Sequence, residues 1–333
     1  MAWTLSELSK IETDPLRKSV ADTLLMESNI LETIPWETIG TLSTTVIRYQ
    51  DLPSVGFRKI NAGYSESTGT FAHKTETISL MGGMIDTDKA LARAKNTVAD
   101  ARAIQQQMMV KAIAYKFNDR FINGNPASDP EEFKGIAARV DDIVAEGYTE
   151  QLIDLGATTG TTRDAGILYD TANAFNFLNK LDQLIYSIKG HQPDMLLMNK
   201  KCLLAVRALL LKERLLDYTQ DMFGRRIDTY GGVKLIDIGT KADQMTEIIT
   251  NTEDPQNIYA SDLSTSIYAV KFGIGEFLWG IQEYPMEVED KGLLESKPVY
   301  RTEIDFPLGL AHIDPRCIGR LCNIFPDNQA AAS

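Results

Sequence analysis

The sequence predicts a mixed α+β fold in which strand-rich and helical segments follow one another along 333 residues. Residues 89–123 contain neither proline nor glycine and are dominated by strong helix formers, which predicts one long helix. Residues 41–84 are rich in β-branched and aromatic side chains and in glycine, which is typical of strands. After residue 165, apolar residues alternate between helical and strand spacing, which indicates a compact α/β module.

The first 40 residues predict an arm rather than a domain. Asp14 and Pro15 form a typical helix start, and apolar residues follow at helical spacing until Pro35 ends any helix. A short amphipathic segment cannot bury its apolar stripe alone, so we expect residues 1–40 to lie against another surface.

Residues 41–85 predict a long hairpin that projects from the body. Thr44–Tyr49, Val55–Ile60 and Thr70–Leu80 are strand-like, and residues 61–70 are polar and interrupted by glycine. The strands carry too few large apolar side chains for a sheet that faces a core. An ordinary surface hairpin is the alternative interpretation.

The long helix is expected to begin after Asp86–Asp88, which predicts an N-cap, and to end at Gly124-Asn125-Pro126. Its apolar stripe is rich in alanine and lacks a sustained heptad of leucines, so a helix lying across a sheet is favoured over a coiled coil. The small-residue segment 156–166 is expected to be a loop at a boundary.

The rest of the chain predicts a compact module followed by a return to strands. We expect helices at residues 170–189 and 199–215. The expected strands, in chain order, are 194–198, 233–238, 259–260 with 267–271, 286–289, 299–306 and 311–313. The glycines from Gly273 to Gly280 lack the context of a dinucleotide-binding loop and are interpreted as a strand bend.

Composition and charge exclude several classes of function. The net charge of −12 provides no general basic field, which disfavours conventional DNA binding. The three cysteines indicate neither a disulfide framework nor a zinc site, so a reducing cytoplasm is expected. No signal peptide or membrane-spanning segment is recognisable, and no membrane partner is expected.

No motif points to chemistry. His73, His191 and His312 lie far apart, and none has a metal-ligand spacing to another His, Cys or carboxylate. Residues 156–162 lack the lysine of a phosphate-binding loop, and no nucleophile elbow or triad signature is present. We therefore expect no catalytic residue, no cofactor and no metal site, and the chain is not expected to be an enzyme.

The order of these segments resembles the Hong Kong 97 (Johnson) fold of tailed-bacteriophage major capsid proteins. The sharpest local similarity is FINGNPASDPEEFKGI at residues 121–136, which looks like the helix end and turn of many such proteins. The resemblance implies a division of the chain into an N-terminal arm 1–40, an extended E-loop hairpin 41–85, a peripheral (P) domain with its spine helix 86–160, a compact axial (A) domain 161–284, and return strands of the P domain with the C-terminus 285–333.

The resemblance implies a major capsid protein that self-assembles through pentamers and hexamers into an icosahedral shell around double-stranded DNA, without sequence-specific DNA binding. Such a protein is located in the virion capsid and is assembled in the host bacterial cytoplasm, with separate scaffolding, portal and decoration proteins as further partners. Some family members crosslink a hairpin lysine to an asparagine of a neighbouring subunit, and Asn323 is a candidate here. The candidate contacts between subunits are Arg58, Lys59, Tyr64, Glu66 and Lys74.

Two alternatives stay open. An encapsulin-type nanocompartment shell has the same fold and encloses protein cargo instead of DNA. A cytosolic α/β enzyme, with an unrecognised site in residues 165–284, is the alternative from another class. The enzyme would be a small oligomer in solution, whereas a shell protein forms particles.

Overall fold

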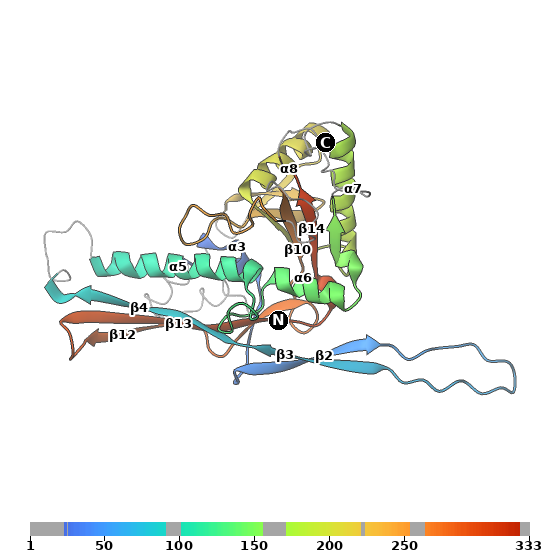
Figure 1. Ribbon diagram of the computed structural model, residues 1–333, viewed down its shortest axis with the longest axis horizontal. Helices are drawn as coiled ribbons and strands as arrows, with labels where there is room; N and C mark the ends of the chain where they lie inside the picture. Colours follow the sequence, from blue (N-terminus) through green and yellow to red (C-terminus); the bar gives the residue numbers. More distant parts are fainter. Residues whose placement is uncertain are drawn as a thin grey trace.

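The computed structural model describes residues 23–24, 26–90, 101–155, 171–220, 224–253 and 264–326. The helix start expected at Asp14 and Pro15, the boundary loop 156–166 and the strand 259–260 lie outside these residues. The described elements form a long sheet covered by a helix, a compact lobe built on a second sheet, and a hairpin that extends away from both (Figure 1).

The long sheet has five strands, and a long helix lies along one of its faces (Figure 1). The strands are β1 (Trp36–Thr38), β4 (Ser79–Asp88), β11 (Leu278–Gln282), β12 (Glu287–Leu293) and β13 (Val299–His312). The described part of the helix is α5 (Ala101–Asn123), which ends before Gly124 as expected. β13 is continuous and pairs with β4, β11 and β12, so the two strands expected at 299–306 and 311–313 are one.

The N-cap expected at Asp86–Asp88 is wrong in part. Asp86 and Thr87 pair with β13 as the last part of β4. Only Asp88 caps, because its Oδ1 accepts a hydrogen bond from the backbone N–H of Ala90 at 2.7 Å. Exposed and covered side chains alternate along β4, and this strand pattern continues through the acidic residues.

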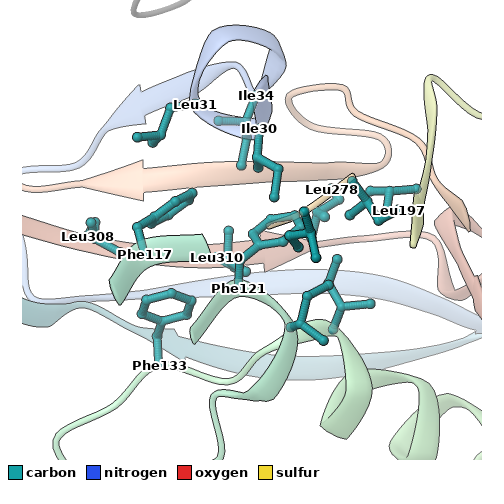
Figure 2. Close-up of a cluster of buried hydrophobic side chains, with 14 of the residues drawn as sticks. Ile30, Leu31, Ile34, Phe117, Phe121, Phe133, Leu197, Leu278, Leu308 and Leu310 are labelled. Carbon is teal, nitrogen blue, oxygen red and sulfur yellow. The ribbon is translucent and has the colours of Figure 1, made fainter. Parts of the chain in front are cut away.

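A short helix from the N-terminal segment completes the core beside α5. This helix, α3 (Asn29–Thr33), is capped by Ser28, whose Oγ accepts a hydrogen bond from the backbone N–H of Leu31 at 3.2 Å. Ile30 and Ile34 belong to the same buried cluster as Phe117 and Phe121 of α5 (Figure 2). The described end of the arm therefore lies against the body of its own subunit.

Gly280 of β11 lies directly against Trp36 of β1, and an added Cβ would be 2.5 Å from the indole Cε3. Trp36 is itself held against Phe306 and Phe117, with ring centroids 5.4 Å and 6.2 Å away, so the indole has little room to move. We expect Gly280→Ala to lower the free energy of unfolding by about 1–3 kcal/mol, measured by urea denaturation. Gly56→Ala is the matched control, because nothing lies within 4 Å of its added Cβ. Equal stability of the two variants would contradict this packing.

The compact lobe is a seven-stranded sheet with the strand order β5-β14-β10-β6-β9-β8-β7. One face carries α7 (Thr171–Ser187) and α8 (Lys200–Glu213), and the other faces the core that contains α5 and α6 (Ile136–Ala145). Both helices predicted for this module, 170–189 and 199–215, are confirmed. The strands are β5 (Leu152–Asp154), β6 (Met195–Met198), β7 (Asp217–Gln220), β8 (Arg226–Tyr230), β9 (Val233–Asp237), β10 (Thr265–Val270) and β14 (Ile318–Ile324), with short 3₁₀ helices at Thr149–Gln151 and Pro315–Cys317.

The two sheets exchange strands across the division expected at residue 284. β11 precedes this residue but pairs with β1 and β13 in the five-stranded sheet. β14 follows it but lies between β5 and β10 in the seven-stranded sheet. Neither sheet is therefore built from one continuous segment of the chain.

The hairpin consists of β2 (Ser43–Asp51) and β3 (Thr70–Thr77), which pair in antiparallel fashion as expected. The strand expected at Val55–Ile60 is wrong, because residues 52–69 have no ladder partner in the described chain. The strand expected at Thr70–Leu80 is divided at Ile78. Its first part pairs with β2 in the hairpin, and its second part, β4, pairs with β13 in the body.

Candidate assembly surfaces

The hairpin presents unusual apolar exposure at its end. Residues 52–69 connect β2 to β3 and are called the tip loop here. Val55 is 96% exposed, Ile60 is 92% exposed, and the Phe57 ring is fully exposed. Large apolar side chains gathered on one projecting loop mark an interaction surface.

Four of the five predicted contact residues lie in the tip loop, and two of them, Arg58 and Tyr64, contact each other. The Arg58 guanidinium lies over the Tyr64 ring, 5.2 Å from its centroid, and donates to the Ala62 carbonyl at 3.3 Å. The Lys59 carbonyl accepts from the backbone N–H of Ala62 at 3.0 Å, which closes the turn. Glu66 is exposed on the returning side of the loop.

Lys74, the fifth predicted contact, lies apart from the others. It sits in β3 near the base of the hairpin, where its ammonium group pairs with Glu146 at the end of α6 within the same subunit. Asn323 is also unsuited to a crosslink on the surface. Its side chain is buried and its Nδ2 donates to Asp154 Oδ1 at 2.9 Å.

A buried ionic cluster joins the base of the hairpin to the body, and sequence reasoning missed it. Arg139 of α6 is 2% exposed, and its Nη1 and Nη2 donate to Glu76 Oε1 and Oε2 of β3 at 2.6 Å and 2.8 Å. Nη2 also donates to the Leu310 carbonyl of β13 at 2.8 Å. Bidentate arginine–carboxylate pairs of this kind fix orientation as well as distance.

A second arginine extends the cluster to the other hairpin strand. Arg48 of β2 donates through Nη1 to Glu146 Oε2 at 3.0 Å, so Glu146 is paired with both Arg48 and Lys74. The His312 ring lies between the two arginines, with Nε2 toward Arg48 and Nδ1 toward Arg139. We call this set the hinge cluster: Arg48, Lys74, Glu76, Arg139, Glu146 and His312.

The pKa values of Glu76 and His312, the two central titratable groups of the hinge cluster, are both lowered. Burial opposes the charge on Glu76, but the charge of Arg139 and hydrogen bonds with His312 and Arg139 lower the pKa of this carboxyl to about 2. Burial lowers the pKa of His312 to about 3, against the hydrogen bond with Glu76, and the charges of Arg139 and Arg48 act in the same direction as burial. Glu76 is therefore ionised and His312 neutral at pH 7.

We expect the free energy of unfolding to fall by about 2 kcal/mol between pH 7 and pH 5, because His312 takes up a proton on unfolding in this range. Its pKa rises from about 3 in the folded chain to 6.5 on unfolding, so the contribution of the neutral ring is complete above pH 6.5 and is lost as the pH falls toward 3. Glu76 adds a loss only below about pH 4.5. Urea midpoints at pH 7, 6 and 5 measure the effect. The slope should be shallower in His312→Gln, and equal slopes would contradict this assignment.

A second surface, also not found from the sequence, lies on the long sheet opposite α5. Gly83 faces the helix, since its added Cβ would touch Met109, whereas its neighbours Leu80 and Met84 are 74% and 57% exposed on the other face. The strand register places Arg301 on that other face, and Lys291 lies there too, since it pairs with Glu303 at 3.2 Å. The register also places six acidic residues there: Asp86, Asp88, Glu287, Glu289, Glu303 and Asp305.

The described residues would support chemistry through metal ligands, reactive thiols or ligand-binding cavities. They contain no group of three or more His, Cys, Asp or Glu side chains placed to hold a metal ion. Burial raises the pKa of the Cys202 thiol to about 12, which removes its nucleophilic form. A cavity of about 390 Å³ lies beside α6, but its Arg320 is already paired with Glu253 at 2.9 Å. Among the described helices, none has the length and apolar character needed to cross a membrane.

Comparison with known proteins shows what the chain resembles. Residues 13–169, just under half of the chain, match the model of a family described as Major capsid protein GP7. No curated protein sequence matches the chain significantly.

Solved shell proteins share the fold. The holo-SrpI encapsulin of Synechococcus elongatus PCC 7942 is 13% identical, with a TM-score of 0.60 over 95% of this chain and 92% of that chain. A structure from Mycobacterium phage Bobi is 12% identical, with a TM-score of 0.58 over 88% and 89%. The capsid of a native GTA particle is 14% identical, with a TM-score of 0.56 over 89% and 90%.

The Hong Kong 97-like fold and the resemblance to major capsid proteins, both predicted from the sequence, are confirmed. At identities of 12–14%, the solved structures show that the fold is shared and no more. The family match adds that residues 13–169 resemble a major capsid protein.

Proposed function

We propose that this chain is the major subunit of a tailed-phage head, which assembles as pentamers and hexamers into an icosahedral shell around double-stranded DNA. The observation that carries the proposal is the hairpin, whose apolar tip loop is exposed while its base is tied into the body. Such a surface needs a partner to cover it, and in a closed symmetric assembly that partner is a second copy of the chain.

The domain division belongs to this proposal. Residues 1–40 are the arm, 41–85 the E-loop, 86–160 the P domain with its spine helix, 161–284 the A domain, and 285–333 the returning P-domain strands and C-terminus. The exchange of β11 and β14 between the two sheets ties the P and A domains into one unit. Separate scaffolding, portal and decoration proteins, assembly in the host bacterial cytoplasm and contact with DNA without sequence recognition complete the proposal.

An encapsulin-type shell is the second candidate. It is favoured by the encapsulin structure, which shares the fold over 95% of this chain with a TM-score of 0.60. The two candidates differ in what the shell encloses. A phage head protects double-stranded DNA, whereas a nanocompartment contains a cargo protein.

Negative-stain electron microscopy with size-exclusion chromatography tests the proposal. Closed shells, tubes or sheets of the purified protein are the expected result. Nuclease-protected DNA in particles from the native source supports a phage head, and a co-purifying protein in its place supports the nanocompartment. A homogeneous dimer or tetramer under all conditions, including crowding, would overturn the shell proposal and favour the enzyme alternative.

We expect the double variant Arg58→Glu/Lys59→Glu to weaken assembly more at low salt than at high salt. Both side chains are exposed in the tip loop, and ion pairs that they form between subunits are screened over a Debye length of about 8 Å at physiological ionic strength. Light scattering during assembly across a salt series measures this. Lys212→Glu, an exposed charge reversal at the end of α8, is the matched control. Normal assembly of the double variant at low salt would argue against these contacts.

A further inference from the structure

We infer that the hinge cluster is a latch that fixes the angle between the hairpin and the body, and that opening it releases the hairpin as a rigid arm without unfolding either part. The latch is a property of the single chain. Its use during assembly rests on the function proposed above, because the hairpin angle decides which surface of a neighbouring subunit the tip loop reaches.

The covalent links between hairpin and body are short enough to act as a hinge. The chain passes between the two parts at residues 39–42 and again at Ile78, the single residue between β3 and β4. One backbone hydrogen bond, from Ile78 N–H to the Leu42 carbonyl at 2.9 Å, ties the two passages together. Large angular changes can be absorbed by a few residues at the ends of elements, as here.

The non-covalent links are mostly ionic. The apolar contact of the hairpin with the body centres on Val46, which packs with Trp279, Ile281 and Ala311 in a small separate cluster. The side-chain hydrogen bonds that join β2 and β3 to α6 and to Glu146 at its end link charged groups: Arg48 and Lys74 bind Glu146, and Glu76 binds Arg139. The hinge angle therefore depends on whether these charges meet.

The charges come from every element that meets at the hinge. β2 contributes Arg48, β3 contributes Lys74 and Glu76, α6 contributes Arg139 and Glu146, and β13 contributes His312 with the Leu310 carbonyl. Three cations thus share two carboxylates around a neutral imidazole. Removing Glu76 leaves the buried Arg139 without a counter-charge, and removing Glu146 does the same to Arg48 and Lys74.

The pairing of charges in the hinge cluster favours a closed and an open state over partly open ones. A buried ion pair gains little over water when complete, but a buried charge that has lost its partner is strongly unfavourable. A partial opening would leave Arg139 or Glu76 in that position, whereas a full opening returns all the groups to water. The hinge cluster is therefore closed or open as a unit, and the β2–β3 ladder is intact in both states.

The test measures the hairpin angle directly. Spin labels are placed on Ser65→Cys in the tip loop and Glu150→Cys beside α6, both exposed positions. The three native cysteines are buried, so labelling is selective. Labelled protein is mixed with an excess of unlabelled protein. Pulsed electron–electron double resonance then reports distances within one subunit, whether or not that subunit is part of an assembly.

We expect one narrow distance distribution for the otherwise unchanged chain and a distribution broader by a factor of about two or more in Glu76→Gln, which removes the charge and one of the two oxygens that Arg139 binds. Glu66→Gln, the same change in the tip loop, should leave the width unchanged. Far-UV circular dichroism and urea denaturation identify folded variants. If Glu76→Gln does not fold, Glu146→Gln at the more exposed side of the cluster replaces it.

A folded Glu76→Gln or Glu146→Gln variant with an unchanged distribution would overturn the latch, even if its stability falls, because the cluster would then only stabilise the fold. This result is separate from the shell proposal. A latch that opens in a chain that forms no particles would contradict the proposed function and leave the latch intact.

Discussion

Replacing the tip loop, residues 52–69, by Asn-Gly is expected to yield folded subunits that form no shells. β2 ends at Asp51 and β3 begins at Thr70, and these two residues already pair, so a two-residue turn can join the strands. The body loses no contact, because the apolar side chains of the loop are exposed in the single subunit. Circular dichroism should report an unchanged fold, while electron microscopy should show no closed particles.

Two further variants separate the chemistry of the tip loop from its length. Val55→Ser/Phe57→Ser/Ile60→Ser keeps the length but removes exposed apolar surface, and it should also fail to assemble if burial against a neighbour stabilises the shell. Ser65→Ala changes one hydroxyl in the same loop and should assemble normally. Intact shells from the shortened chain would show that the tip loop is not an intersubunit contact.

Arg139→Leu is expected to be the most destabilising single substitution in the hinge cluster. It leaves Glu76 and His312 buried beside a leucine, with both oxygens of Glu76 deprived of their bidentate partner. Removing one member of a buried ion pair costs about 3–5 kcal/mol, because the remaining charge has neither partner nor water. Urea denaturation at pH 7 measures the loss.

The control for Arg139 is an arginine on the surface. Arg226→Leu removes a side chain that stacks over Tyr218 and is largely exposed, and its cost should not exceed about 1 kcal/mol. The double variant Arg139→Leu/Glu76→Leu should recover much of the loss, since replacing a buried pair by apolar residues is often neutral. A single-variant loss as small as that of Arg226→Leu would show that the pair is solvated.

The sequence predicted well those elements whose signal is local. α5 follows from a run without proline or glycine, and α7, α8 and β6 follow from apolar spacing over a few turns or residues. The β2–β3 hairpin was recognised in the same way. The strand expected at Val55–Ile60 failed because β-propensity describes how a residue fits a sheet, and in the single chain no strand lies beside it.

The hinge cluster could not be found from spacing. Arg48 and His312 are separated by 264 positions, and Glu76 and Arg139 by 63. The partners of His312 are distant in sequence. They reach it through the pairing of β2 with β3 and through Arg139, which extends from α6 to β13. One signal was available: Arg139 falls on the apolar face of a short helix, beside Val140 and Ile143, where an arginine needs a buried partner.

The position of β14 between two other strands has a consequence for biosynthesis. This strand is the last of the seven in chain order, yet it lies between β5 and β10 and supplies both neighbours with backbone partners. The lobe therefore cannot close until the ribosome has made residue 324, however early its helices form. Contacts of such long sequence separation fold slowly and late. A nascent subunit thus stays incomplete until this last strand of the sheet has been made, which delays its first encounter with other copies until the lobe can form.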